Sequence, residues 1–285
     1  MKLASIQTSG EMFTLLAADQ IVGIADRLGV ALPGQSLQSP LQSVYHQIVT
    51  TFAPEISGVV LAPELGNTTI PQIFEQSGII LPLERRTFDA DPLSVPILAQ
   101  NWGVEAIRNN YAVAKLELFF NPEEKEAASK KQLVAEVYDY CQHEGIDLLL
   151  EVLVYMEGTE AAYHERFPEL QLGAVQELRN LCSVLALEYP LNALGAVTVT
   201  AELDIPWILS MRDTPYDLAK EQLRTALESG ACGFLAMEQF LPEKPETGLP
   251  EFDPQHVRQF IETTGRDRLI EVSRIVAEAG SANSQ

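Results

Sequence analysis

Short apolar runs recur along the chain, and longer segments with mixed apolar and polar residues separate them. Most of these runs are nearly continuous in hydrophobic residues, which is the pattern of parallel strands covered on both faces. Eight runs predict strands at 13–19, 57–64, 78–84, 112–120, 146–155, 183–190, 205–211 and 232–240.

The segments between and after these runs have the spacing of amphipathic helices. The clearest is 122–145, which starts with acidic residues, becomes basic later and ends at Gly145. This order of charges and a terminal glycine both stabilise a helix. Ser39 and Pro40 are suited to begin another helix. The predicted helices cover 39–52, 122–145, 168–181, 214–230, 254–265 and 266–280.

Eight strands alternating with helices predict an α/β protein with a single (β/α)₈ TIM barrel. We expect this barrel to cover residues 1–280 and a disordered tail to follow at 281–285. An open, doubly wound sheet is the alternative. No Gly-x-Gly-x-x-Gly or Walker A pattern follows any of the runs, which argues against a nucleotide-binding sheet.

Charge and composition narrow the class of partner. The 285 residues include 40 Asp and Glu against 19 Lys and Arg, a net charge of −21 that repels nucleic acids and anionic membrane surfaces. We see no signal peptide and no apolar run near 18 residues. Three widely spaced cysteines fit a reducing cytoplasm. We expect a cytoplasmic protein with a small-molecule ligand, and the sequence leaves a homo-oligomer open.

Charged residues gather near the ends of the predicted strands, where barrel enzymes hold their active sites. A single charge at a strand end ordinarily enters solvent. Lys115, Glu117 and Glu151 differ because apolar residues flank them, and an unpaired buried charge is costly. The charged residues near strand ends are Asp19, Glu64, Glu84, Lys115, Glu117, Glu151, Glu188, Arg212, Asp213 and Glu238.

Lys115 is the only one of seven lysines on a predicted strand. A desolvated lysine can attack a carbonyl as a Schiff-base nucleophile, and a carboxylate such as Glu151 can then shuttle protons. Glu117 opposes this role because a nearby anion favours the ammonium form. Lys115 is therefore a Schiff-base nucleophile, a fixed cation that orients a substrate oxygen, or part of a buried salt bridge without catalysis.

Several segments, in order along the chain, resemble the tagatose-1,6-bisphosphate aldolase family. The matching stretches are LLAADQ (15–20), VVLAPELG (59–66), LERRTFD (83–89), AKLELFFNPEE (114–124), LLLEVLVY (148–155), FPEL (167–170) and FIETTGRDRLIEV (260–272). The family consists of class I aldolases with a (β/α)₈ barrel. The resemblance therefore implies a lyase of carbohydrate metabolism, and we expect no cofactor.

The resemblance also implies roles for individual residues. Asp19 and Gln20 match polar residues of the family's active site, and Lys115 matches its fourth-strand lysine. Glu151 matches the carboxylate assigned to proton transfer, and Glu188 matches a glutamate on the sixth strand.

Other positions depart from the family. Ala186 stands where the family has its Schiff-base lysine, and Ile21 stands where it has a phosphate-binding arginine. Met237 and Glu238 replace the Gly-Arg pair that grips a phosphate, and a glutamate there repels phosphate. After the seventh strand SMRD (210–213) replaces Ser-Ala-Gly, so that Arg212 restores one cation.

Three hypotheses remain. The first is a divergent aldolase with lyase-type or related carbonyl chemistry on a sugar or keto acid. Its expected catalytic residues are Lys115 and Glu151, and its expected substrate-binding residues are Asp19, Gln20, Glu84, Glu117, Glu188, Ser210 and Arg212. The second is a catalytically inactive ligand-binding or scaffold protein. The third is a divalent-metal enzyme that uses the strand-end carboxylates, although no histidine joins them and we expect no bound metal.

Overall fold

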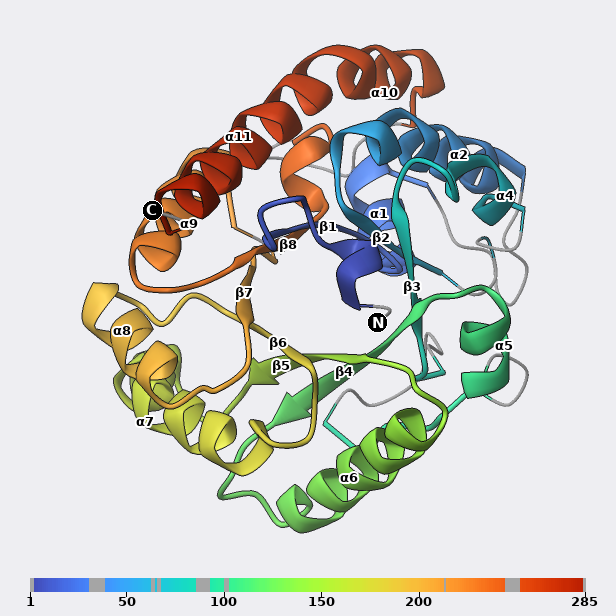
Figure 1. Cartoon of the computed structure of the whole chain (residues 1–285). Coiled ribbons are helices and arrows are strands. Elements are labelled where there is room, and N and C mark those ends of the chain that lie inside the picture. Colours follow the sequence, from blue (N-terminus) through green and yellow to red (C-terminus); the bar gives the residue numbers. More distant parts are fainter. Residues whose placement is uncertain are drawn as a thin grey trace.

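The computed structural model describes residues 3–30, 39–62, 65, 68–85, 93–99, 103–212, 214–243 and 252–283. Eight parallel strands pair in sequence order and close into a barrel (Figure 1), which confirms the predicted fold and rules out the open sheet. The strands are β1 (Phe13–Ala18), β2 (Gly58–Leu61), β3 (Gly78–Pro82), β4 (Val113–Phe120), β5 (Leu148–Val154), β6 (Val184–Leu187), β7 (Trp207–Ser210) and β8 (Gly233–Ala236).

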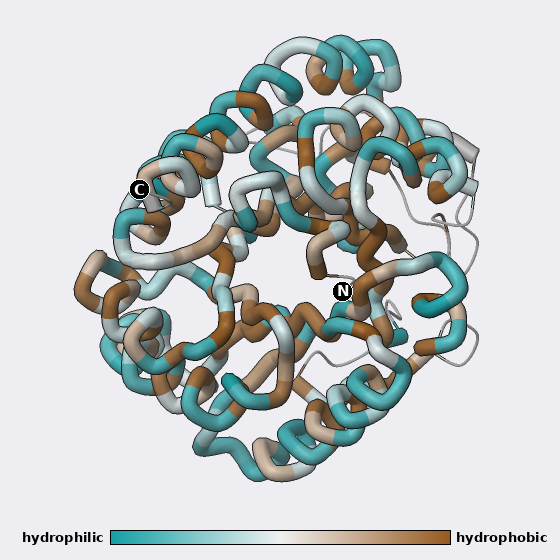
Figure 2. Tube along the Cα trace, in the orientation of Figure 1, coloured by the Kyte–Doolittle hydropathy of each residue, from teal (hydrophilic) through white to brown (hydrophobic). Residues whose placement is uncertain are grey.

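Helices surround the barrel and cover its outer face (Figure 1). The α-helices are α1 (Ile21–Leu28), α2 (Ser39–Phe52), α4 (Ile70–Ile73), α5 (Val104–Asn109), α6 (Ala127–His143), α7 (Glu160–Leu178), α8 (Ala193–Ala201), α9 (Tyr216–Glu228), α10 (Pro254–Phe260) and α11 (Arg266–Asn283). The shorter helical turns are η1 (Leu3–Ile6), η2 (Ala53–Glu55), η3 (Glu238–Phe240) and η4 (Ile261–Gly265). Figure 2 shows brown, hydrophobic residues along the strands and alternating brown and teal along the helices.

Every predicted helix is present, with some different bounds. Helix α7 starts at Glu160 rather than at 168, because the Thr159 side chain accepts a hydrogen bond from the amide of Ala162 and the helix then tolerates Pro168 in its interior. Helix α11 continues to Asn283, three residues into the tail that we expected to be disordered, and 284–285 lie outside the described residues.

Among the α-helices of the described residues, α1, α4, α5 and α8 were not predicted from the sequence. Helix α8 shows why, because its sequence ALGAVTVTA has no charge and is rich in β-branched residues, which favour strands. The side chain of Asn192 caps this helix by accepting a hydrogen bond from the amide of Gly195 at 3.0 Å. The cap and the packing of Ala196 and Val199 into the core outweigh the local preference.

The register of the barrel brings distant polar residues to one level. The pairing of β4 with β5 sets Glu117 beside Glu151, and the pairing of β5 with β6 sets Glu151 beside Ala186. Because side chains alternate along a strand, Lys115 shares its face of β4 with Glu117, as predicted. Three neighbouring strands therefore contribute to the same part of the barrel.

The amino-terminal turn η1 closes the other end of the barrel, where it contacts β1, β2 and β3. This contact requires a glycine at the start of β3, because a Cβ atom on Gly78 would lie 2.1 Å from the carbonyl oxygen of Ser5. The barrel thus has one end covered by η1 and one end formed by the carboxyl termini of the strands.

Candidate functional site

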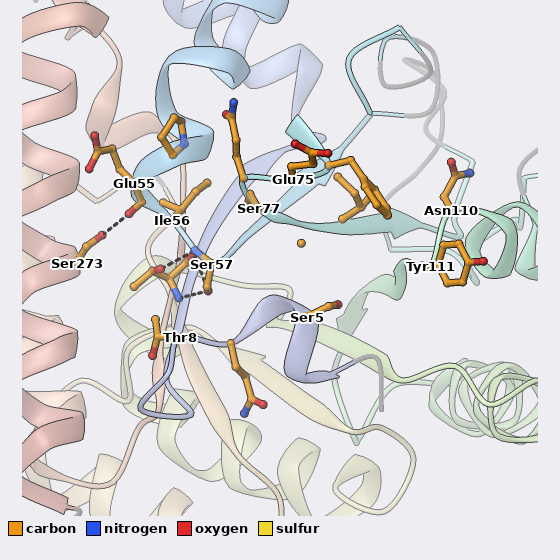
Figure 3. A pocket seen from close by; sticks show the side chains of 17 residues that line it. Ser5, Thr8, Glu55, Ile56, Ser57, Glu75, Ser77, Asn110, Tyr111 and Ser273 are labelled. Carbon is orange, nitrogen blue, oxygen red and sulfur yellow. Dashed lines mark hydrogen bonds between the residues drawn. The ribbon is translucent and has the colours of Figure 1, made fainter. Parts of the chain in front are cut away.

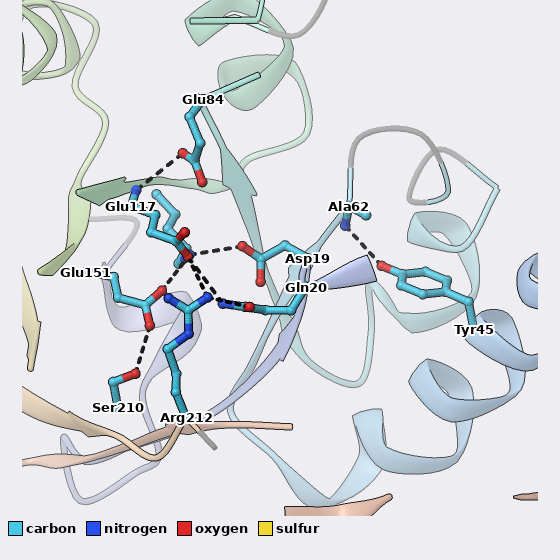
Figure 4. A network of polar contacts seen from close by, with 10 residues as sticks. Asp19, Gln20, Tyr45, Ala62, Glu84, Glu117, Glu151, Ser210 and Arg212 are labelled. Atoms are coloured by element: carbon cyan, nitrogen blue, oxygen red, sulfur yellow. Dashed lines mark hydrogen bonds and ion pairs between the residues drawn. The ribbon is translucent and has the colours of Figure 1, made fainter. Parts of the chain in front are cut away.

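A buried ion cluster lies toward the carboxyl ends of the strands (Figure 4). The ammonium Nζ of Lys115 lies 2.9 Å from Oδ2 of Asp19 and 2.7 Å from Oε2 of Glu151. The side chains of Lys115 and Asp19 are 0% exposed and that of Glu151 is 1% exposed. Ser210 donates a hydrogen bond of 2.7 Å to Oε1 of Glu151. We call these four residues the inner layer.

A second set of side chains lies over the inner layer. Oε2 of Glu117 lies 3.2 Å from Nη2 of Arg212 and accepts a hydrogen bond of 3.2 Å from Nε2 of Gln20. Arg212 also donates to Oε1 of Gln20. The side chains of Glu117 and Arg212 are 14% and 22% exposed, so this outer layer separates the inner layer from solvent. Glu84 accepts a hydrogen bond of 3.3 Å from the amide of Glu117.

The two layers are linked, but not in the way the sequence suggested. Glu117, the neighbour of Lys115 on its own strand, lies 3.7 Å from Nζ, farther away than either Asp19 or Glu151. Glu117 is instead closer to Arg212. Arg212 lies in the segment that departs from the family resemblance, and the structure pairs it with Glu117.

The cluster carries more negative than positive charge. Three carboxylates, those of Asp19, Glu117 and Glu151, surround the two cations Lys115 and Arg212. A site with an excess carboxylate repels an anionic ligand at short range. The arrangement suits a neutral ligand better than a phosphate or a carboxylate.

Glu151 is held in its ionised form. Burial by itself raises the pKa of Glu151, but the charges of Lys115 and Arg212 and the hydrogen bonds from Lys115 and Ser210 outweigh burial and lower it to about 2. A carboxylate with so low a pKa is a poor proton donor near neutral pH. Glu151 therefore acts here as a counter-ion of Lys115.

Glu188, directly after β6, has a raised pKa, in contrast to Glu151. Burial raises its pKa to about 7, although a hydrogen bond from the amide of Val154 and the charge of Arg212 lower it, and the nearby charge of Glu151 raises it further. The bond from Val154 reaches Oε2 of Glu188 at 2.9 Å. A carboxyl group with this pKa can both accept and donate a proton near neutral pH.

All nine candidate residues named from the sequence lie in the described part of the chain, and the structure brings most of them together. Hydrogen bonds and ion pairs join eight of them, and Glu188 is coupled to Glu151 and Arg212 through charge. Glu64 and Asp213 lie outside the described residues. Among the described residues no group of three or more His, Cys, Asp or Glu side chains is arranged to hold a metal ion.

A second buried lysine was not predicted from the sequence. Lys130, on α6, is completely buried and donates hydrogen bonds to the carbonyl of Phe119 at 2.7 Å and to Glu124 at 2.9 Å. Its ammonium also lies 5.1 Å from the centre of the Tyr155 ring. One signal was available, because Lys130 begins the buried stripe of α6. That stripe consists of Lys130, Val134, Val137 and Cys141.

Comparison with known proteins supports the aldolase resemblance. No family model matches the chain. A tagatose 1,6-diphosphate aldolase 2 of Streptococcus pyogenes serotype M1 is 25% identical over 85% of this chain and 82% of its own length. A tagatose 1,6-diphosphate aldolase 2 of Streptococcus mutans is 21% identical over 98% of this chain and 94% of its own length.

Solved structures agree on the fold. An archaeal fructose 1,6-bisphosphate aldolase superposes with a TM-score of 0.69 at 14% identity, covering 97% of this chain and 98% of its own. A Schiff-base-forming fructose-1,6-bisphosphate aldolase gives a TM-score of 0.67 at 14% identity. The sequence relatives and this shared barrel support an aldolase-type protein. In the described part of the chain no helix is long and apolar enough to span a membrane.

Proposed function

We propose that the carboxyl end of the barrel binds a neutral sugar with a carbonyl group and carries out aldolase-like lyase chemistry, with Lys115 as a permanent cation. The observation that carries this proposal is the position of the Lys115 ammonium, 2.9 Å and 2.7 Å from two buried carboxylates. The family resemblance puts the Schiff-base lysine at residue 186, which is alanine here.

A Schiff base requires a neutral amine, and the surroundings of Lys115 favour the charged one. Carboxylates within 3 Å stabilise an ammonium ion and make its deprotonation costly. A fixed ammonium is instead suited to stabilise negative charge on an oxygen atom. Cleavage of the carbon–carbon bond next to a carbonyl group places such a charge on the carbonyl oxygen, so Lys115 would act by electrostatic stabilisation.

The charge of the site favours an unphosphorylated sugar over a keto acid or a sugar phosphate. The excess carboxylate in the cluster opposes an anion, and Arg212 is already engaged by Glu117. Ile21 and Glu238 stand where the family has phosphate-binding arginines, and Glu238 is 8% exposed. A sugar hydroxyl or carbonyl can form hydrogen bonds with the polar side chains of the cluster without adding charge to the site.

Glu188 is the group best suited to move the proton. Its pKa of about 7 lets it take a proton from a substrate hydroxyl and return one to the carbon of the product. Glu151, with a pKa of about 2, and Asp19 would then hold Lys115 in position. This assignment moves the acid–base role from Glu151 to Glu188.

The test uses the full-length protein with a panel of unphosphorylated ketoses and aldoses. Cleavage, and exchange of the proton next to the carbonyl with D₂O, are followed by NMR. We expect turnover that falls by roughly 100-fold or more in Glu188→Gln, as for loss of a general base. We expect little change in Glu271→Gln, a matched control because Glu271 lies on α11 and bonds Tyr216 and Lys220.

The pH profile and a trapping experiment complete the test. Because Glu188 must be ionised to accept a proton, kcat/KM should rise with pH and level off above about 7. Borohydride should trap no adduct on Lys115. An adduct on Lys115, or full activity in Glu188→Gln, would overturn the mechanism.

A second candidate is a ligand-binding protein without chemistry. The complete enclosure of the Lys115 side chain favours it, since a substrate reaches Lys115 only if the outer layer moves. Calorimetry with the same sugar panel separates the two. Binding without conversion, unaffected by Glu188→Gln, supports the binding protein.

A further inference from the structure

A cavity of about 560 Å³ opens at the end of the barrel opposite to the ion cluster. Figure 3 shows the side chains that line it. Its walls come from the starts of three strands: Ser57 directly precedes β2, Gly78 begins β3 and Tyr111 precedes β4. Ser5 of η1 forms a further wall. A cavity of this size falls in the range of small-ligand sites.

The chemistry of the walls is polar but not cationic. Among the described residues that line the cavity there is no Lys, Arg or His. Of the two lining carboxylates, Glu55 is neutralised by Arg266, whose Nε lies 3.0 Å from Oε1. These described residues therefore offer hydroxyl and amide groups to a ligand and no cation to an anion.

Ser77 lines the cavity, and its hydroxyl oxygen is buried in the wall. Its side chain is 7% exposed, and its hydroxyl has no hydrogen-bond partner in the described part of the chain. The hydroxyls of Ser57 and Thr14, by contrast, are bonded to each other's backbone, at 2.9 Å in both directions. A buried hydroxyl without a partner is destabilising, and rotation of the Ser77 side chain about χ1 would turn its hydroxyl toward a ligand in the cavity.

Two exposed aromatic rings stand at the rim. Phe74 is 50% exposed and Tyr111 is 70% exposed, and both line the cavity. Tyr111 has a φ of 53°, a left-handed conformation that is unfavourable for a bulky side chain. Strain of this kind collects at functional sites. The rings provide flat apolar surfaces beside hydroxyl and amide groups, which suits the mixed surface of a polyol.

We propose that this cavity binds a small neutral polyhydroxylated molecule, a free polyol or monosaccharide, at a site separate from the ion cluster. A change in χ1 brings the Ser77 hydroxyl to a hydroxyl of the ligand, with which it forms a hydrogen bond, and Phe74 and Tyr111 cover the C–H face of the ligand. Because the described lining residues include no cation and the chain has a net charge of −21, a phosphorylated ligand binds less well.

The test is saturation-transfer NMR on the full-length protein with D-glucitol as the probe and D-glucitol 6-phosphate as its charged counterpart. The cavity variants are Ser77→Ala and Tyr111→Asn, since asparagine tolerates a positive φ and keeps the backbone. The control is Tyr140→Asn, at an exposed tyrosine of α6 that does not line the cavity.

We expect a glucitol signal that falls at least fivefold in both cavity variants and persists in Tyr140→Asn. Glucitol should bind at least tenfold better than its phosphate. Without ligand, Ser77→Ala should raise Tm by about 2 °C, because it removes an unsatisfied hydroxyl.

Three outcomes would overturn the proposal. One is the absence of any glucitol signal, and another is a signal that survives in both cavity variants. The third is a change from dimer to monomer in Tyr111→Asn without glucitol binding to the native chain, since the rim would then be a contact between copies.

Discussion

Lys115 and Lys130 are both completely buried, but their surroundings differ in charge and in position. Lys130 faces one carboxylate, one backbone carbonyl and one aromatic ring, and its partner Glu124 is 12% exposed. Its charge is balanced, and its hydrogen bonds connect α6 to Phe119 of β4 and to Glu124, which follows β4.

Lys115 has an excess of negative partners. Two carboxylates within 3 Å are almost fully buried, and a third lies at 3.7 Å. This group lies under a partly exposed layer at the end of the barrel where such folds hold their sites. Burial of a lysine therefore does not by itself mark a site. Uneven charge beside a partly open layer distinguishes Lys115 from a structural lysine.

The largest expected effect comes from Lys115→Met. The substitution leaves Asp19 and Glu151 buried without their cation, which costs roughly 3–5 kcal/mol of the free energy of unfolding. Urea denaturation at pH 7 measures this loss. The loss of unfolding free energy should be smaller at pH 3, where protonation of the carboxylates relieves their repulsion. A loss below about 1 kcal/mol at pH 7 would show that the cluster does not depend on Lys115.

A smaller loss is expected for Lys130→Met. Glu124 is partly exposed and can regain water, so we expect a cost of about 1–3 kcal/mol, chiefly from the lost hydrogen bonds. The same urea experiment measures it, and sugar turnover or binding should stay at the native level. A change in turnover as large as that of Glu188→Gln would remove the distinction between the two lysines.

The smallest effect on stability is expected for Glu117→Leu. Lys115 keeps Asp19 and Glu151, and Arg212 keeps Gln20, so the free energy of unfolding should change by less than about 1 kcal/mol. The substitution removes the excess negative charge, and affinity for a phosphorylated sugar should rise. Glu117→Gln serves as the matched variant without the change in shape. If neither variant alters the preference between neutral and anionic sugars, Glu117 does not select the ligand.

Helix α8 and the barrel strands show which elements local sequence patterns can predict and which they cannot. The continuous apolar runs predicted all eight strands, since strands buried on both faces must be apolar throughout. Helix α8 was not predicted because its residues favour strands and tertiary packing decides its conformation.

In the candidate site, too, the sequence predicted some features and the tertiary structure decided others. Apolar neighbours identified Lys115, Glu117 and Glu151 as unusual in the sequence. The sequence did not show that Asp19, 96 positions away, contacts Lys115 more closely than Glu117 does.

The sequence by itself determined the barrel, its strand order and the residues at its carboxyl end. Local hydrophobic patterns are sufficient for this because they reflect the periodicity and burial of each strand. Only the tertiary structure decided which charges pair, that Lys130 is buried, and that a polar cavity opens behind η1. Ion pairing and cavity shape depend on distances of a few ångströms between strands far apart in the chain. Closure of the barrel sets those distances.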